Sequence, residues 1–282
     1  MRTSALRSLA FAGLASGLLL ASGCKRETDI QPNEDVTTAE DRSEDNLETA
    51  LSADLMTAAQ PQDAAVSNSS SVAGALELRR IYGTCATRTY DAPSRTLTID
   101  FGPTNCLCPD GRSRRGKIIA VFATDLNRRI AGAVVTRENY FVNDNQHVAT
   151  RTFTDLGSGS FTVAVTNASI IRANNGGTHS WTANWTFMRT AGFGTAITSD
   201  DVYSVTGTAN GTNRRKVQYT TAVQTPLIKR GDCYKYFVAG IVSITNSNSR
   251  AMLLNYDPSG TQTCDNTAAV TVNGRTKTIV LR

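Results

Sequence analysis

The chain has 282 residues, of which 40% are hydrophobic and 19% charged, and its formal net charge is +5. This length suffices for one large domain or two small ones. No segment after the N-terminal region approaches the roughly 18 consecutive apolar residues of a spanning helix, which excludes a bundle of such helices. The charge is unevenly distributed: Lys25–Gly74 holds 3 basic and 11 acidic residues, whereas Ala75–Arg282 holds 24 basic and 13 acidic ones.

The N-terminus has the layout of an export signal. Arg2 and Arg7 precede an apolar run that ends in Ala21-Ser22-Gly23-Cys24. This segment resembles the lipobox of bacterial lipoproteins, although Ala21 stands where that motif usually has Leu. The resemblance implies cleavage after residue 23 and acyl chains on Cys24, so that a lipid holds the protein on a membrane. The alternative is a secretory signal in which Cys24 is incidental.

Residues 24–75 are predicted to be a flexible acidic tether. They are rich in Glu, Asp, Thr, Ser, Ala and Gln and contain no aromatic residue. Such a composition buries too little apolar area to offset the entropy of ordering. Leu47, Leu51, Leu55 and Met56 follow a weak helical spacing, so a short amphipathic helix over 44–59 that docks on the body is an alternative within this tether.

Residues 76–282 are predicted to form an all-β domain. Apolar and Thr-rich positions alternate, as in Trp181–Met188, and turn signals such as Asn273-Gly274 separate the alternating runs. Short connections favour a meander of about twelve antiparallel strands, forming a curled sheet, a sandwich or a partly closed barrel. The expected strands lie near 80–90, 95–101, 116–125, 132–143, 147–156, 160–172, 179–190, 201–209, 216–225, 234–245, 250–256 and 267–281, the last being a hairpin pair.

Five cysteines remain once Cys24 is assigned to the lipid, and an oxidising compartment favours their pairing. Local hairpin pairing predicts Cys233–Cys264, and Cys85 with either Cys106 or Cys108, which leaves one thiol over. A zinc site would need paired Cys or His clusters, and the two histidines lie far from the cysteines in sequence. We therefore expect no metal and no cofactor.

The most specific motif runs from Ile99-Asp100-Phe101-Gly102 through Cys108 to the Asp110-Gly111-Arg112 turn and the strand from Gly116. It resembles a pattern of secreted lipoproteins of Bacteroidetes-type bacteria. The resemblance covers about residues 80–282 and implies no activity and no catalytic residue.

Basic clusters fall in predicted turns. If two clusters share one end of the sheet, their guanidinium groups would form an anion-binding rim for an acidic glycan or lipopolysaccharide. The alternative is that they protect sheet edges and keep the protein soluble. Nucleic acid is not an expected partner, because no known binding module is present. The candidate anion-binding residues are Arg112, Arg114, Arg115, Lys117, Arg214 and Arg215.

Trp181 and Trp185 lie on one face of a predicted strand. Exposed, they would form an aromatic platform for sugar rings; buried, they would belong to the core, where large aromatic residues usually lie.

Catalysis has little support, because the sequence contains no nucleophile elbow and no identifiable pair of converging carboxylates. We therefore expect a non-enzymatic binding or structural module that is lipid-anchored at the outer membrane, at the cell surface. Lys25 after the cysteine is similar to outer-membrane-directed lipoproteins. The alternative is a periplasmic protein that handles lipid or assists envelope assembly through a concave β-face; a glycan hydrolase is a third, less favoured hypothesis.

Overall fold

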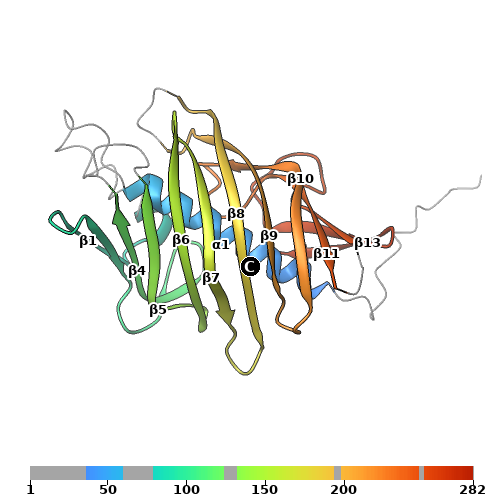
Figure 1. Cartoon of the computed structure of the whole chain (residues 1–282), viewed down its shortest axis with the longest axis horizontal. Coiled ribbons are helices and arrows are strands. Elements are labelled where there is room, and N and C mark those ends of the chain that lie inside the picture. Colours follow the sequence, from blue (N-terminus) through green and yellow to red (C-terminus); the bar gives the residue numbers. More distant parts are fainter. Residues whose placement is uncertain (1–35, 60–78, 124–131, 194–197, 248–250, 282) are drawn as a thin grey trace, which may run out of the picture.

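A computed structural model describes residues 36–59, 79–123, 132–193, 198–247 and 251–281. Within these residues, 14 strands form one antiparallel sheet, and a long helix, α1 (Thr37–Ala59), lies against it (Figure 1). The predicted signal peptide and Cys24 lie outside the described residues.

The strands follow one another across the sheet in chain order, with only the short β3 off the path as a partner of β4. β1 and β14 end this order without pairing with each other, so the sheet is open. The all-β antiparallel meander predicted from the sequence is confirmed. The strands are β1 (Thr87–Asp91), β2 (Thr96–Asp100), β3 (Cys106–Leu107), β4 (Ser113–Phe122), β5 (Ala133–Val142), β6 (Asn145–Gly157), β7 (Ser160–Ile171), β8 (Thr178–Ala191), β9 (Val202–Thr212), β10 (Gln218–Arg230), β11 (Ala239–Asn246), β12 (Ala251–Asn255), β13 (Thr267–Val272) and β14 (Arg275–Val280).

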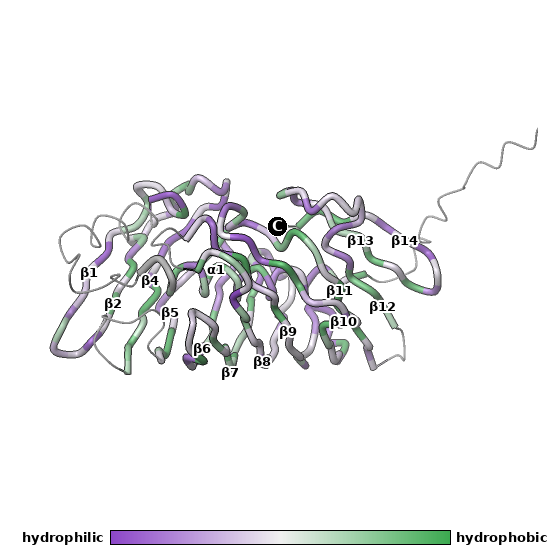
Figure 2. The backbone as a smooth tube through the Cα atoms, turned by 90° about the horizontal axis from the view of Figure 1, so that it is seen from above, coloured by the Kyte–Doolittle hydropathy of each residue, from purple (hydrophilic) through white to green (hydrophobic). Residues whose placement is uncertain are grey.

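Side-chain alternation divides the sheet into an inner and an outer face. On β8 the inner positions are buried and include Trp181, Trp185 and Phe187, whereas Thr182 and Asn184 point outward and are exposed. The sheet bends gently, and α1 lies on its concave, inner side (Figure 2). One contiguous hydrophobic core links this inner face to the apolar residues of α1, among them Leu47, Leu55 and Met56.

Residues 37–59, predicted to belong to a flexible tether, are instead helical, and 37–56 are almost entirely buried. The helix begins well before the short helix considered over 44–59. Its first turn carries Glu40, whose charge suits a helix N-terminus. Most of its other acidic groups form ion pairs with basic side chains of the sheet and its connections, and Asp45 pairs with Arg42 of the helix itself, which is why so polar a segment can be buried. The rest of the predicted tether lies outside the described residues.

Two disulfides crosslink connections near the two ends of the sheet. Cys85 is bonded to Cys106 and Cys233 to Cys264, and Cys108 is a buried free thiol. This agrees with the predicted pairing and decides between the two candidate partners of Cys85. The disulfides indicate an oxidising, extracytoplasmic compartment. Among the described residues, no helix combines the length and apolarity needed to cross a bilayer.

Candidate functional site

The basic residues at the start of β4 form ion pairs with a neighbouring acidic residue. Arg114 is fully buried and donates two hydrogen bonds to the Asp110 carboxylate, at 2.8 and 2.5 Å, and one to the Tyr140 hydroxyl. These contacts lower the pKa of Asp110 against the opposing effect of its burial. Arg112 is also buried, 4.0 Å from Asp110. This pair of arginines therefore fixes the turn rather than facing a ligand.

The outward-facing basic residues of β4 are also paired. Arg115 lies 2.5 Å from Asp144 and its guanidinium stacks over the Phe141 ring, while Lys117 lies 3.4 Å from Asp100. An open groove of about 460 Å³ adjoins these groups. Because the cations are balanced by carboxylates, the groove does not select anions by charge.

Arg214 turns inward from the β9–β10 connection and pairs with Glu40 and Asp41 of α1, while its neighbour Arg215 is exposed. In the meander, this connection and the start of β4 lie at the same end of the sheet. Five strand spacings separate β4 from β9, or about 24 Å. The predicted basic clusters therefore do not combine into one anion-binding rim, since they are far apart and most of their charges are already paired.

Trp181 and Trp185 are buried beneath α1, so the aromatic-platform hypothesis is wrong and the core alternative holds. On the neighbouring strand, Gly211 pairs with Trp181 and Gly207 with Trp185. A Cβ on Gly207 would come within 2.7 Å of the Trp185 ring, so the missing side chain is what makes room for the indole. His179 stacks on Trp181 with ring centroids 4.8 Å apart.

The outer face carries a feature that the search for charged motifs missed. One cross-strand row runs from β2 to β14, takes one residue from every strand of that span except β3, and contains no charged side chain. On β1 the row continues to the exposed Asp91. All its members are at least partly exposed. We call this set the central outer row: Thr96, Val121, Val134, Thr152, Ala164, Asn184, Thr208, Ala222, Ser243, Leu253, Thr271 and Thr276. At ordinary strand spacing it spans about 50 Å.

Shorter rows beside it have the same character. On one side, Thr154, Thr162, Thr186 and Thr206 are paired across four strands. On the other, Thr182, Asn210, Thr220 and Thr245 continue the pattern across β8–β11. The central outer row and these two flanking rows together form what we call the hydroxyl-amide face. The sequence did show Thr-rich alternation, but only the strand register reveals that the rows align.

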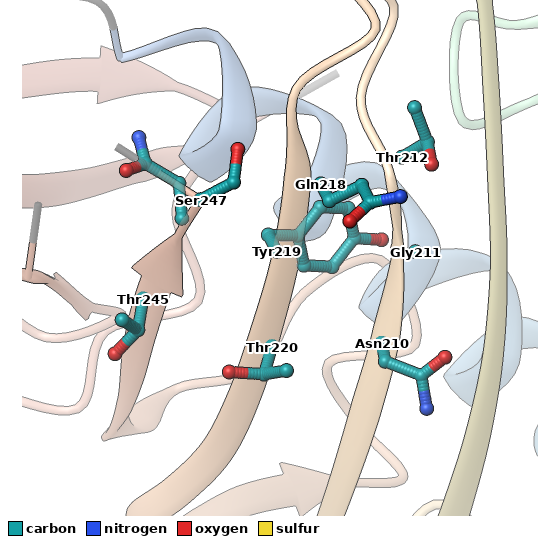
Figure 3. A pocket seen from close by; sticks show the side chains of 9 residues that line it. Asn210, Gly211, Thr212, Gln218, Tyr219, Thr220, Thr245 and Ser247 are labelled. Atoms are coloured by element: carbon teal, nitrogen blue, oxygen red, sulfur yellow. The ribbon is translucent and has the colours of Figure 1, made fainter. Parts of the chain in front are cut away.

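An open groove of about 470 Å³ lies over β9, β10 and β11 on this face (Figure 3). Its lining is uncharged and consists of hydroxyl and amide side chains together with Gly211 and Tyr219: Asn210, Thr212, Gln218, Thr220, Thr245, Asn246 and Ser247. These side chains both donate and accept hydrogen bonds. The groove can therefore hold polar, uncharged groups, and it offers neither a nucleophile paired with a base nor a charged anchor.

The two histidines lie beneath α1, each beside a carboxylate. His179 lies 3.2 Å from Asp45 and 2.7 Å from the Tyr219 hydroxyl, and His147 lies 3.6 Å from Glu48. Both histidines and both acids are buried. No group of three or more His, Cys, Asp or Glu among the described residues could hold a metal ion. These pairs therefore link α1 to the sheet and do not line an open cleft.

Comparison with protein-family models, curated proteins and solved structures found no match.

Proposed function

We propose that this protein is an exported, lipid-anchored binding module whose hydroxyl-amide face binds a neutral, hydroxyl-rich polysaccharide. The observation that carries the proposal is the uncharged central outer row, which crosses the sheet from β2 to β14. The anchor would be the lipid on Cys24, with the body outside the outer membrane. The resemblance to secreted lipoproteins of Bacteroidetes-type bacteria supports this placement.

The lack of charge on this face is informative because the rest of the domain is strongly charged. Ala75–Arg282 holds 24 basic and 13 acidic residues, yet none lies in the central outer row. The β-propensity of Thr would by itself explain why threonine is frequent on this face. Strand propensity disfavours Lys and Glu only mildly, and charged side chains normally keep exposed sheet surfaces soluble. If this face is covered by an uncharged binding partner, a charged side chain here would be buried without a counter-charge, which would account for the absence of such residues from the row.

Hydroxyl and amide groups match the chemistry of a neutral sugar chain, since each side can donate and accept. The face is broad and its groove is open, so each sugar would be held weakly. A polymer lying along the row would engage many such contacts at once, and the linked contacts would add up to useful avidity. This favours a polysaccharide over a small soluble sugar, and a neutral glycan over the acidic one expected from the basic clusters.

The competing hypotheses have less support. Lipid handling would need an open apolar concavity, but α1 covers the inner face and charged groups lie beneath it. Glycan hydrolysis would need two carboxylates converging in an accessible site. Asp45 and Glu48 are buried. All four carboxylates that line two small pockets form ion pairs with basic side chains: Glu40 and Glu44 in one pocket, Asp54 and Asp201 in the other.

The test is a pull-down of purified protein with insoluble cellulose, chitin and β-1,3-glucan. Asn184 and Thr208 are adjacent in the central outer row and exposed. We expect wild type to bind at least one of these polymers, and N184K/T208K to lose about tenfold or more in affinity, because each lysine would have to be desolvated without a partner.

The matched control is T104K/T263K, which adds the same charge at two exposed loop threonines. It should bind like wild type. Absence of wild-type binding to every polymer would refute the proposal, as would equal losses in the two double variants.

A further inference from the structure

A layer of buried charge lies between α1 and the inner face of the sheet. Three guanidinium groups occupy it: Arg42 from α1, Arg137 from β5 and Arg151 from β6. Their side chains are at most 3% exposed, with that of Arg137 the most accessible. Two carboxylates share the layer, Asp45 and Glu48 of α1, and both are buried as well. We call these five groups the buried arginine layer.

Two of the three arginines each form an ion pair with one of the two carboxylates. Arg42 lies 2.8 Å from Asp45, and Arg137 lies 2.5 Å from Glu48. Arg151 is fully buried, and within the structure described all three of its side-chain nitrogens are without a hydrogen-bond partner. Arg137 likewise has one terminal nitrogen without a partner.

An unmatched buried guanidinium is costly. Burying a charge without a partner costs several kcal/mol even after relaxation. The two carboxylates do not balance the three guanidinium charges. Burial holds the pKa of Asp45 well above its usual range, so its ionised form is disfavoured. Burial, and then the neighbouring Arg137 charge, also lowers the pKa of Arg151 to about 9. The layer is therefore short of at least one negative charge.

The cross-strand neighbours of Arg151 offer its guanidinium no hydrogen-bond acceptor. Its cross-strand neighbours on the inner face are Val135 and Val165, followed by Ala183 in the same row. None of these carries a polar side-chain atom. The charged and titratable groups that act on Arg151 are Arg137, Glu48, Asp45 and Tyr140. Among them Arg137 adds an unused donor, and Arg42, the third arginine of the layer, has two further side-chain nitrogens without a partner.

We propose that Arg151 and Arg137 together bind a small inorganic anion of about the size of chloride between α1 and the sheet. Guanidinium donors form charge-assisted hydrogen bonds that suit such an ion. The anion neutralises the third arginine of the layer and so stabilises the packing of α1. This site is separate from the outer hydroxyl-amide face and does not depend on the function proposed for it.

The direct test is crystallography of the full mature protein grown in sodium bromide, with data collected at the bromine absorption edge. We expect an anomalous peak within about 3.5 Å of the Arg151 guanidinium, since halides accept hydrogen bonds at a slightly longer range than oxygen. A water molecule or no density at that position would overturn the proposal.

The solution test compares thermal unfolding in chloride and in gluconate at equal ionic strength. A ligand that binds only the folded state raises the midpoint as its concentration rises. We expect wild type to gain about 5 °C between 1 and 150 mM chloride. Arg151→Met, which keeps an unbranched apolar stem but removes the charge, should gain less than about 1 °C. The matched control is Arg115→Met on the outer face, which should keep the full response.

Equal chloride responses in wild type and Arg151→Met would contradict the site. If Arg151→Met does not fold, the bromide experiment on wild type still decides the question.

Discussion

Gly116 shows how a single residue shapes one end of the sheet. It lies at a register shift between β4 and β5, has a positive φ of 88°, and a Cβ there would come within 1.9 Å of the Asn139 carbonyl oxygen. Gly111 has a similar φ of 80°, but a Cβ there would meet nothing within 4 Å. Both glycines adopt a positive φ that other residues disfavour, but only at Gly116 would a side chain also clash with the neighbouring backbone.

We predict that Gly116→Ala destabilises the protein by about 3 kcal/mol or more, because backbone strain and a backbone clash combine. Gly111→Ala should cost about 1 kcal/mol, from φ alone. Urea unfolding monitored by tryptophan fluorescence would measure both. Similar losses of unfolding free energy in the two variants would contradict this prediction, because they would mean that the backbone near Asn139 moves aside without an energetic cost.

His179 should make the protein sensitive to mild acid. Burial, followed by the charge of Arg42, lowers the pKa of His179 to about 2. Because this value lies below the ordinary one of about 6.5, the unfolded chain binds the extra proton first, and stability falls as the pH drops below about 6.5. Between pH 6.5 and 5 the loss from this group is about 2 kcal/mol.

Urea unfolding at pH 7.5, 6.5, 5.8 and 5.0 would measure this effect. We expect a clear fall in wild-type stability over the last three points and a shallower fall in His179→Gln, which cannot take up the proton. Parallel curves for the two proteins would mean that other groups cause the acid loss.

At the scale of the element, α1 is held by ion pairs of unequal burial. The Asp41 side chain is fully buried and pairs with Arg172 and Arg214. Glu44 also pairs with Arg172, at 2.5 Å, but its side chain is 16% exposed. Removing Asp41 leaves Arg172 and Arg214 with one carboxylate each and leaves the Arg214 backbone N–H without its acceptor, whereas a partly hydrated pair contributes less.

We therefore expect Asp41→Ala to destabilise the protein by about 3 kcal/mol and Glu44→Ala by about 1 kcal/mol or less. Denaturant unfolding of both variants at neutral pH would provide the comparison. A larger loss for Glu44→Ala would contradict the ranking by burial.

The same helix marks the limit of prediction from the sequence. The strands were predictable because the alternation of β8 and the Asn273-Gly274 turn are local signals. The extent of α1 was not, because a composition rich in Asp, Glu and Thr indicates disorder when it is considered alone. The groups that make its burial favourable, such as Arg137 and Arg214, lie 89 and 173 residues from their partners. The hydroxyl-amide face was hidden for a related reason, since it depends on register across many strands.

At the scale of the whole molecule, the disulfides close loops near both ends of the sheet. The bonded cysteines are 21 residues apart in one pair and 31 in the other. In the chain-entropy account, loops of this size stabilise a fold by about 3 kcal/mol each. Their position suits an open sheet, whose first and last strands have a neighbour on only one side.

We predict that non-reducing peptide mapping recovers Cys85 linked to Cys106 and Cys233 linked to Cys264. Cys108 should react with iodoacetamide only after unfolding, because it is buried and its burial raises the pKa of the thiol. Reduction should lower the unfolding midpoint. Rapid alkylation of Cys108 in the native protein, or a peptide that links it to Cys85, would contradict this arrangement.

The meander has a consequence for the order in which the chain folds during export. Each strand pairs with its neighbour in sequence, so hairpins can form one after another as the polypeptide leaves the translocation channel. The helix is the exception: Thr37–Ala59 emerges first, but its contacts reach as far as Tyr256, 210 residues later. A hydrophilic segment of this length gains little from being helical alone. It therefore remains exposed to solvent and to proteases until nearly all of the sheet that buries it has folded.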